Sequence, residues 1–479
     1  MTLKKSTINS RMLHMFIVLN VLLLCVVVSM TYFELVGKES LMSNNYNRRL
    51  KAYEDGIIRG EILDRNGEVL AYSEMVEGIS KRVYPYKRLY SHVIGYSNDR
   101  LGKTLLEAKY NEMLLGKNAL GLMGNTISLV TGEDKTGNNL ILTIDHDLQT
   151  RARELLGDNR GAIVALNPKT GEILAMVSTP DYNPNENALL ENWDALSTDG
   201  QSPLLPRAVR GLYPPGSTFK VVTAIAALES GHEAFTVDDQ GSIVIDGKIF
   251  ANAYDKAYGP LDMTTAMAVS SNVYFTALTT VLDSKDLIKS AEKAGINRSI
   301  DFDLATSTSK VGKTIESKTE YAATTIGQGQ LLVTPLQMAL IGAGIANEGT
   351  IMKPYLVKSI SDRSDVVLTT TKDSKLYQLT DATTADRIKE MMVEVVKSGT
   401  GKKAAISEVT VAGKTGTAQN EKSSLGSGYD HAWFIGFAPA EAPEIAIAVI
   451  VENHAEDGGQ IAAPIARKIM SLWIKELNH

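Results

Sequence analysis

The chain has 479 residues, of which 44% are hydrophobic and 22% charged, and a formal net charge of −6. A chain of this length is too long to fold around a single hydrophobic core, so two or three domains are expected. The negative net charge argues against a nucleic-acid-binding protein. The single cysteine, Cys25, excludes an internal disulfide and a cysteine metal cluster.

The first predicted element is a membrane-spanning helix over residues 12–33. This run is rich in Leu, Val, Met and Phe and has no Asp, Glu, Lys or Arg, and about 21 helical residues span roughly 30 Å, one hydrocarbon core. The preceding Lys4, Lys5 and Arg11 favour a cytoplasmic segment over residues 1–11 and an extracytoplasmic remainder. A cleaved signal peptide is the alternative, but its apolar region is normally shorter and no A-x-A-like site follows. We therefore expect an uncleaved, single-pass anchor in the cell membrane.

A smaller β-rich domain is predicted over residues 34–139. Two short apolar runs flank Asn66-Gly67, which is the strongest short signal for a β-hairpin. The many Tyr and Arg residues of this region form no catalytic pattern and are expected to serve packing and interfaces. The polar, glycine-bearing stretch at residues 131–139 marks the boundary to a second domain, residues 140–479.

The second domain is predicted to combine short strands with helices. Asp145 can cap a helix that runs to Leu156, and Gly157 can close it. Strands are predicted over residues 140–144, 161–167, 172–178, 409–415, 432–437 and 445–451, and further helices over residues 286–294, 335–346, 384–398 and 463–477.

A serine follows a Pro-Pro-Gly break in this domain. The break predicts a helix that begins at or beside Ser217, and the residues from Val221 to about Ser230 are apolar nearly all round, which is typical of a buried helix. Residues i and i+3 share a helix face, so the amine of Lys220 is expected next to the hydroxyl of Ser217. The helix N-terminus adds free N–H donors and partial positive charge. These are the parts of an acylatable serine.

Neither of the short motifs here is specific by itself. Ser-x-x-Lys and Lys-Thr-Gly each occur three times, and context selects one copy of each. Only Ser217-x-x-Lys220 has a break before it and a buried helix after it, and only Lys414-Thr415-Gly416 follows an apolar strand. The other copies lie in a polar helix, a loop, a linker and a hairpin turn: Ser290-x-x-Lys293, Ser307-x-x-Lys310, Lys135-Thr136-Gly137 and Lys169-Thr170-Gly171.

Ser270-Ser271-Asn272 lies between the two selected motifs. Alone, the triplet is typical of a helix terminus or turn. The order S-x-x-K, S-x-N, K-T-G is, however, the set found in penicillin-binding proteins and class A β-lactamases. Three matches in order, each in a fitting context, argue against coincidence.

On these motifs the chain resembles class B penicillin-binding proteins, which are membrane-anchored peptidoglycan D,D-transpeptidases, and its short first domain resembles the penicillin-binding protein A subgroup. The resemblance implies an α+β transpeptidase domain, an antiparallel sheet flanked by helices, over residues 140–479, and a non-catalytic pedestal of the dimerisation type over residues 34–139. Further matching stretches are Arg59-Gly60 with Asp64-Arg65-Asn66-Gly67, Leu106-Glu107-Ala108-Lys109-Tyr110, Gly327-Gln328-Gly329, Thr334-Pro335-Leu336-Gln337 and residues 412–418.

The resemblance also implies a serine acyl-enzyme that needs no metal or cofactor. Lys220 would accept the Ser217 proton, and Ser270 would pass a proton to the leaving amine. Asn272 would hold the substrate amide and orient Lys220, while the N–H groups of Ser217 and Thr417 would form the oxyanion hole. The expected catalytic residues are Ser217, Lys220, Ser270 and Asn272, and the expected substrate-binding residues are Lys414, Thr415, Gly416 and Thr417.

The implied partners are peptidoglycan stem peptides, lipid-linked nascent glycan, β-lactam antibiotics and a SEDS-type glycosyltransferase in the membrane, with a role in elongation or division. Three alternatives remain at this point. A β-lactamase would need a deacylating base, and the familiar E-x-x-L-N pattern is absent between Ser270 and Lys414. A D,D-carboxypeptidase shares the three motifs, but the pedestal argues against it. A catalytically idle scaffold for a glycan polymerase is disfavoured by the intact motifs.

Overall fold

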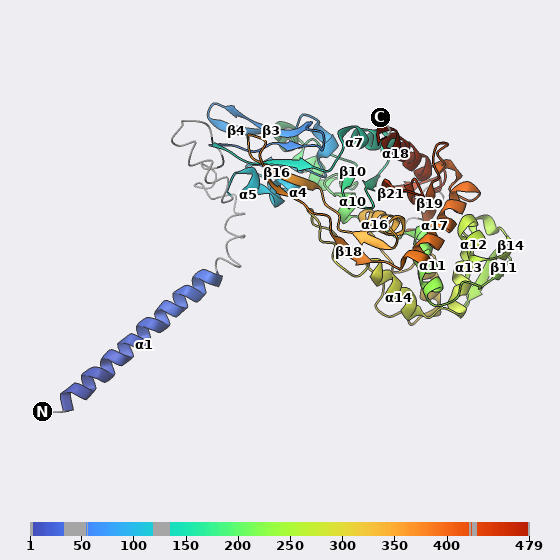
Figure 1. Ribbon diagram of the computed structural model, residues 1–479, viewed down its shortest axis with the longest axis horizontal. Helices are drawn as coiled ribbons and strands as arrows, with labels where there is room; N and C mark the ends of the chain where they lie inside the picture. The colour runs from blue at the N-terminus through green and yellow to red at the C-terminus, as the bar shows by residue number, and fades with distance from the viewer. Residues whose placement is uncertain are drawn as a thin grey trace.

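The structure, a computed structural model, describes residues 3–32, 54, 56–117, 135–420, 423 and 429–477 (Figure 1). The first helix, α1 (Leu3–Tyr32), contains an apolar stretch, Met12–Thr31, that is long enough to cross a membrane and has none of its surface buried. This agrees with a single-pass anchor. The end of the predicted span, Phe33, lies outside the described residues, as do residues 34–53, 55 and 118–134 of the predicted pedestal.

A six-stranded sheet forms the centre of the region next to α1 in the chain. Its order is β17-β16-β8-β2-β3-β4. β2 and β3 pair antiparallel across Asn66-Gly67, and Gly67 has a φ of 91°, so the predicted hairpin is confirmed. The strands are β2 (Ile62–Leu63), β3 (Val69–Val76), β4 (Ile79–Val83), β8 (Asn139–Leu142), β16 (Val357–Ser361) and β17 (Val367–Thr370).

This sheet takes strands from both sides of the predicted domain boundary. β16 and β17 come from far downstream, and β16 pairs antiparallel with β8. The domain boundary between residues 139 and 140 therefore stays a prediction, because strands from both sides of it pair in one sheet. The smaller elements of this region are β1 (Ile57–Ile58), paired with β7 (Lys135–Thr136), β5 (Ser97–Asn98), paired with β6 (Gly102–Lys103), η2 (Lys87–Tyr90), α4 (Leu105–Lys109) and α5 (Asn111–Leu114).

A five-stranded antiparallel sheet in the order β10-β9-β21-β20-β19 forms the second core. Its strands are β9 (Gly161–Leu166), β10 (Ile173–Thr179), β19 (Ala412–Ala418), β20 (Asp430–Ala438) and β21 (Ile445–His454). Side chains alternate between two cores, as period-2 packing requires. Along β21, Ala446, Ala448 and Ile450 join one core, whereas Ile447, Val449 and Val451 join the other.

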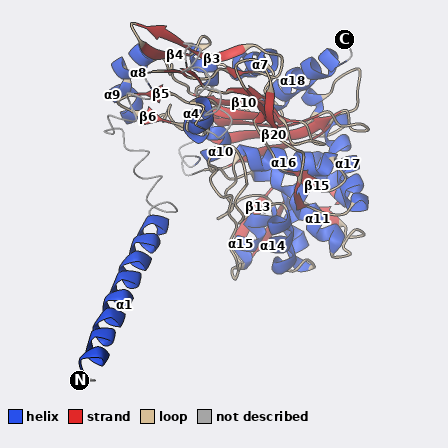
Figure 2. Ribbon diagram, turned by 60° about the vertical axis from the view of Figure 1, so that its left-hand side comes forward, coloured by secondary structure: helices blue, strands red, loops and turns tan. Residues whose placement is uncertain are grey.

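Helices cover both faces of this sheet, so the α+β architecture is confirmed (Figure 2). One face carries α7 (His146–Leu156) and α18 (Ala462–Leu477), and the other carries α10 (Arg207–Arg210) and α16 (Pro335–Ala346). The predicted cap of α7 is present, since the Asp145 carboxylate accepts from the Leu148 N–H at 3.0 Å.

The remaining elements lie mostly on the α16 side, where α11 (Lys220–Glu229) is buried along most of its length, as predicted. They are α8 (Glu186–Glu191), α9 (Trp193–Thr198), α12 (Met263–Val269), α13 (Asn272–Ala277), α14 (Ser284–Lys293), α15 (Lys318–Thr325), α17 (Ala382–Lys397), the short 3₁₀ helices η3 (Gly216–Phe219), η4 (Ala253–Asp255), η5 (Leu278–Thr280) and η6 (Lys402–Ala404), and the paired strands β11 (Val237–Asp239) with β14 (Gly259–Leu261), β12 (Ser242–Ile245) with β13 (Lys248–Ala251) and β15 (Thr350–Met352) with β18 (Lys375–Gln378).

Candidate active site

Ser217 lies in the 3₁₀ turn η3, which leads directly into α11 at Lys220. The turn is locked by Gly216, whose φ is 54° and whose N–H donates to the Gly327 carbonyl at 2.9 Å. A Cβ on Gly216 would lie 2.6 Å from the carbonyl oxygen of Thr417, so only glycine fits here. The predicted helix start at Ser217 is confirmed, and the half-buried serine is held on a rigid turn.

Two buried lysines meet at Ser270. The Lys220 amine donates to the Ser270 carbonyl at 2.7 Å and to the Asn272 Oδ1 at 2.8 Å, and lies 3.3 Å from the Ser270 hydroxyl oxygen. The Lys414 amine donates to the same hydroxyl oxygen at 2.8 Å and to the Thr415 carbonyl at 2.9 Å. Because both amines approach the Ser270 oxygen as donors, the hydroxyl proton of Ser270 is free to point elsewhere.

The hydroxyl of Ser217 has no hydrogen-bond partner among the described residues. Lys220 directs its hydrogen bonds to the turn at residues 270–272 instead. The two side chains are neighbours through the helix geometry alone. Catalytic hydrogen bonds are often long or absent before substrate binds, so this arrangement leaves Lys220 available as a base.

Burial favours the neutral form of both lysines. It is the main reason why the pKa of Lys220 lies well below its usual value; the nearby positive charge of Lys414 lowers it further, while Asp239 acts in the opposite direction. Burial also lowers the pKa of Lys414 to about 7. A neutral lysine amine is a proton acceptor, which an ordinary surface lysine at neutral pH is not.

The S-x-N triplet is both a helix terminus and part of this cluster. Ser270 ends α12 with a left-handed φ of 61°, and Ser271 caps α13 by accepting from the Tyr274 N–H at 2.9 Å. Asn272 is the first residue of α13. The interpretation of the triplet as a helix terminus is therefore confirmed, and the sharp change of direction between the two helices also brings Ser270 and Asn272 into contact with Lys220.

The Lys414-Thr415-Gly416-Thr417 segment lies on β19, an edge strand of the five-stranded sheet. A Cβ on Gly416 would lie 2.9 Å from the Thr218 Cγ2, so the strand packs tightly on the serine turn. Thr415 shares a 2.6 Å hydrogen bond with Thr400, and Thr417 is exposed. The strand spans Ala412–Ala418 and not the predicted residues 409–415, because its pairing with β20 begins at Ala412, opposite Phe437, and continues to Ala418.

The structure thus brings the predicted residues to one place and leaves the rejected motif copies elsewhere. Within the described part of the chain, none of those copies contacts the cluster. The Lys293 and Lys169 side chains pair with Glu229 and Glu444, and the Lys310 backbone forms an isolated antiparallel β-bridge with Leu332.

Sequence reasoning missed a supporting layer behind the S-x-N turn. Asn252 accepts from the backbone N–H of Asn272 at 2.7 Å and donates to Asp239, which also accepts from the Ser271 hydroxyl at 2.6 Å. Asp246-Gly247, a hairpin dipeptide, was the available signal for the β12–β13 hairpin that leads to Asn252. No local pattern links that hairpin to the turn at residues 270–272. Among the described residues, no group of three or more His, Cys, Asp or Glu side chains is arranged to hold a metal.

Comparison with known proteins gives consistent matches over nearly the whole chain. Residues 161–471 match the penicillin binding protein transpeptidase domain, and residues 59–140 match the penicillin binding protein A dimerisation domain. The peptidoglycan D,D-transpeptidase PbpA of Mycolicibacterium smegmatis is 32% identical, over 98% of this chain and 99% of its own. The peptidoglycan D,D-transpeptidase MrdA of Acinetobacter baumannii is 32% identical, over 83% of this chain and 67% of its own.

Solved structures agree with these relatives. The ceftriaxone acyl-enzyme complex of penicillin-binding protein A from Mycobacterium tuberculosis aligns with a TM-score of 0.83 and 33% identity, covering 87% of this chain and 98% of that one. A D,D-transpeptidase domain from Eggerthella lenta aligns with a TM-score of 0.79 and 34% identity, covering 88% of this chain and 100% of that one.

Proposed function

The chain belongs to the penicillin-binding protein transpeptidases, as a class B protein of the PbpA type, and we propose that its D,D-transpeptidase reaction runs through an acyl-enzyme on Ser217. The protein is a serine-type peptidoglycan transpeptidase of cell-wall synthesis and a target of β-lactams. The observation that carries the residue assignment is the meeting of Lys220 and Lys414 at Ser270 beside the serine turn.

In the first half-reaction Ser217 attacks the carbonyl carbon between the two terminal D-alanines of a stem peptide. The hydroxyl proton passes to the amine of Lys220, whose lowered pKa supports a neutral resting form. The N–H groups of Ser217 and Thr417 stabilise the negative charge that develops on the carbonyl oxygen. The close contact between Gly216 and the Thr417 carbonyl supports this assignment, because it brings the two segments together.

Collapse of the tetrahedral intermediate breaks the peptide C–N bond. The leaving D-alanine amine takes a proton from the Ser270 hydroxyl, which is replenished through the lysines that bond its oxygen. Lys414, Thr415, Gly416 and Thr417 on the open edge of β19 bind the terminal carboxylate and the peptide backbone. An amine of a neighbouring stem peptide then attacks the ester, the cross-link forms and Ser217 regains its proton.

Covalent labelling with a fluorescent penicillin tests this assignment. The purified wild-type protein is expected to become labelled and to lose the label slowly, and the Ser217→Ala variant is expected to remain unlabelled. Ser290→Ala and Ser307→Ala, in the two rejected motif copies, are matched controls that should label normally. Undiminished label on Ser217→Ala would remove the proposal. Incubation with a donor peptide and an acceptor amine separates transpeptidation from carboxypeptidation, since only the former yields the amide product.

We further propose that the N-terminus is cytoplasmic and that α1 and the pedestal engage a SEDS-type glycosyltransferase. The support is the basic residues before the apolar stretch, Lys4, Lys5 and Arg11, and the pedestal itself. Reporter fusions at either side of α1 test the orientation. Co-purification with a SEDS polymerase, lost when α1 is exchanged for an unrelated span, tests the partner. Retention of the complex after that exchange would place the contact elsewhere.

A further inference from the structure

A buried carboxylate that the mechanism above does not use lies behind the S-x-N turn. Asp239, the last residue of β11, has no exposed surface. Its Oδ2 accepts from the Ser271 hydroxyl at 2.6 Å, its Oδ1 accepts from the Gly241 N–H at 2.8 Å, and both oxygens lie 2.8 Å from the Asn252 Nδ2. Every partner is a donor, so both oxygens act as acceptors, which is the hydrogen-bonding pattern of an ionised carboxylate. No salt bridge joins Asp239 to a described Lys, Arg or His.

The first arm from this carboxylate runs through Ser271. The Ser271 oxygen accepts from the Tyr274 N–H, so its single proton is committed to Asp239. Ser271 is thereby fixed both as the cap of α13 and against Asp239. Its neighbour Ser270 holds a left-handed φ of 61°, a conformation that a non-glycine residue keeps only when its surroundings enforce it.

The second arm runs through Asn252. Its NH₂ group donates to Asp239 and to the Lys256 carbonyl, so its Oδ1 is the end that accepts from the Asn272 N–H at 2.7 Å. The Asn272 side chain in turn donates to the Ala251 carbonyl at 2.7 Å. The amide of Asn272 is therefore oriented with its oxygen toward Lys220.

We propose that Asp239 is a positioning residue of the transpeptidase reaction: through Ser271 and Asn252 it holds Ser270 and Asn272 in place against Lys220. This inference rests on the proposed acyl-enzyme at Ser217 and adds a residue that touches neither substrate nor nucleophile. It assigns the short strand β11 a function in catalysis.

The charge of Asp239 also acts on the base. Burial lowers the pKa of Lys220 most, the charge of Lys414 on β19 lowers it further, and Asp239 on β11 raises it. Replacing Asp239 by a neutral residue removes the one raising effect, so the Lys220 pKa falls. Lys220 then becomes neutral at a lower pH. In a plot of acylation rate against pH, the rising part on the acidic side, the acid limb, therefore moves to lower pH.

The experiment measures the second-order rate of acylation by a fluorescent penicillin across pH, with the folded fraction determined for each variant. Asp239→Asn is expected to lower the plateau rate about tenfold or more and to shift the acid limb to lower pH. Asp64→Asn is the matched control. Asp64 is equally buried and accepts from the N–H groups of Asn66, Glu68 and His146, but lies in the pedestal. Its loss should affect folding without changing the rate per folded molecule.

A wild-type rate and profile in Asp239→Asn would overturn the proposal. So would a loss of rate in both variants that follows the folded fraction, with the acid limb unmoved.

Should Asp239→Asn fail to fold, Ser271→Ala removes the first arm and keeps the charge of Asp239. A lower acylation rate with an unmoved acid limb in this variant supports the proposal, and a wild-type rate overturns it. Ser217→Ala accompanies each assay, because label on that variant refutes the acyl-enzyme assignment whatever Asp239 does.

Discussion

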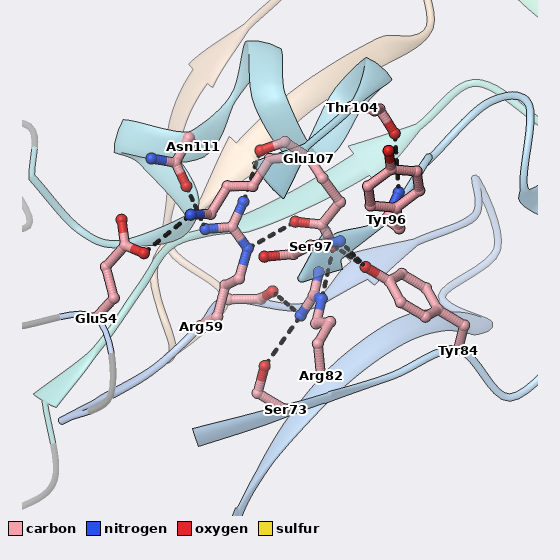
Figure 3. A network of polar contacts seen from close by, with 12 residues as sticks. Glu54, Arg59, Ser73, Arg82, Tyr84, Tyr96, Ser97, Thr104, Glu107 and Asn111 are labelled. Carbon is pink, nitrogen blue, oxygen red and sulfur yellow. Dashed lines mark hydrogen bonds and ion pairs between the residues drawn. The ribbon is translucent and has the colours of Figure 1, made fainter. Parts of the chain in front are cut away.

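Two buried clusters of ionisable side chains, one in the pedestal and one at the proposed active site, are built on opposite principles. In the pedestal, the Glu107 carboxylate lies between two guanidinium groups, with Arg59 Nε at 2.6 Å and Arg82 Nε at 2.7 Å, and the Tyr84 hydroxyl donates to it at 3.2 Å (Figure 3). At the proposed active site, the amines of Lys220 and Lys414 both approach the hydroxyl oxygen of Ser270.

The pKa values follow from this difference. Burial by itself raises the pKa of Glu107, but Arg59 and Arg82 outweigh it and lower that pKa to about 2, so the carboxylate stays charged. At the catalytic centre, burial lowers the pKa of both lysines and the charge of Lys414 lowers that of Lys220 further. Desolvation is common to the two clusters. In the pedestal, the opposite charges of Arg59 and Arg82 keep the buried Glu107 carboxylate ionised. At the lysine pair, the like charge of Lys414 adds to burial and favours the neutral form of Lys220, which can accept a proton.

The largest effect is expected on replacing the base. Lys220→Met should lower the acylation rate by a factor of about 10²–10⁴, because the Ser217 proton loses its acceptor. Folding should suffer less than in a pedestal charge deletion, since Lys220 forms no salt bridge with a described carboxylate that its loss would break. Stopped-flow acylation with a fluorescent penicillin, together with a melting curve, checks both parts. Acylation at the wild-type rate would show that the lysine cluster does not supply the base.

Deleting the central charge of the pedestal should have the reverse pattern. Glu107→Ala leaves two buried guanidinium groups without their partner, which is expected to cost about 3–5 kcal/mol in free energy of unfolding. Acylation per folded molecule should stay unchanged. Glu233→Ala, which breaks the exposed pair with Arg387, is the matched control and should cost about 1 kcal/mol or less. Equal losses in the two variants would contradict the buried-cluster interpretation.

The same cluster predicts that the pedestal is acid-labile. The pKa of Glu107 is lower in the folded protein, about 2, than its ordinary value of 4.5. The contribution of this carboxylate to stability is therefore fully present above about pH 4.5 and is lost as the pH falls toward 2. Glu107→Gln should remove this part of the pH dependence, which melting curves at successive pH values would measure. An unchanged slope in that variant would mean that other carboxylates dominate.

The coupling between the two lysines gives a smaller, directional effect. Lys414→Ala removes a positive charge that lowers the pKa of Lys220, so that pKa rises and the acid limb of acylation moves to higher pH. The plateau rate should also fall, because Ser270 loses a donor. This shift is opposite in sign to the one expected for Asp239→Asn. A shift of both variants in the same direction would exclude a common origin in the Lys220 amine.

Much of the fold, and the candidates for the site residues, could be predicted from local signals. The Pro-Pro-Gly break before Ser217, the apolar helix after it, the Asn66-Gly67 hairpin and the Asp145 cap all depend on neighbours in the chain, and the structure confirms each. The apolar strand that precedes Lys414-Thr415-Gly416 then distinguished this copy from the other two.

The parts that could not be predicted depend on contacts between distant segments. The pairing of β16 with β8 joins residues such as Val357 and Leu142, and no local pattern encodes it. Asp239, which bonds the Ser271 hydroxyl, lies on a three-residue strand that is too short for periodicity to identify. Helix geometry predicted that Lys220 lies near Ser217, but the direction of its hydrogen bonds is decided by the turn that packs on it.

The smallest expected effect tests whether the pedestal cluster depends on its hydrogen bonds as well as on its charges. The Tyr84 hydroxyl donates to Glu107 and accepts from the Ser97 N–H at 2.8 Å (Figure 3). Tyr84→Phe keeps the ring and both ion pairs but leaves that N–H without its partner, so a loss of about 1–2 kcal/mol in free energy of unfolding is expected. Tyr377→Phe, which removes a hydroxyl that bonds the Ser299 carbonyl at an exposed position, is the control and should cost less. Chemical denaturation of both variants measures the difference. If Tyr84→Phe were as stable as the wild type, the two guanidinium groups alone would account for the permanent charge of Glu107, and the contrast with the lysine pair would rest entirely on the signs of the charges.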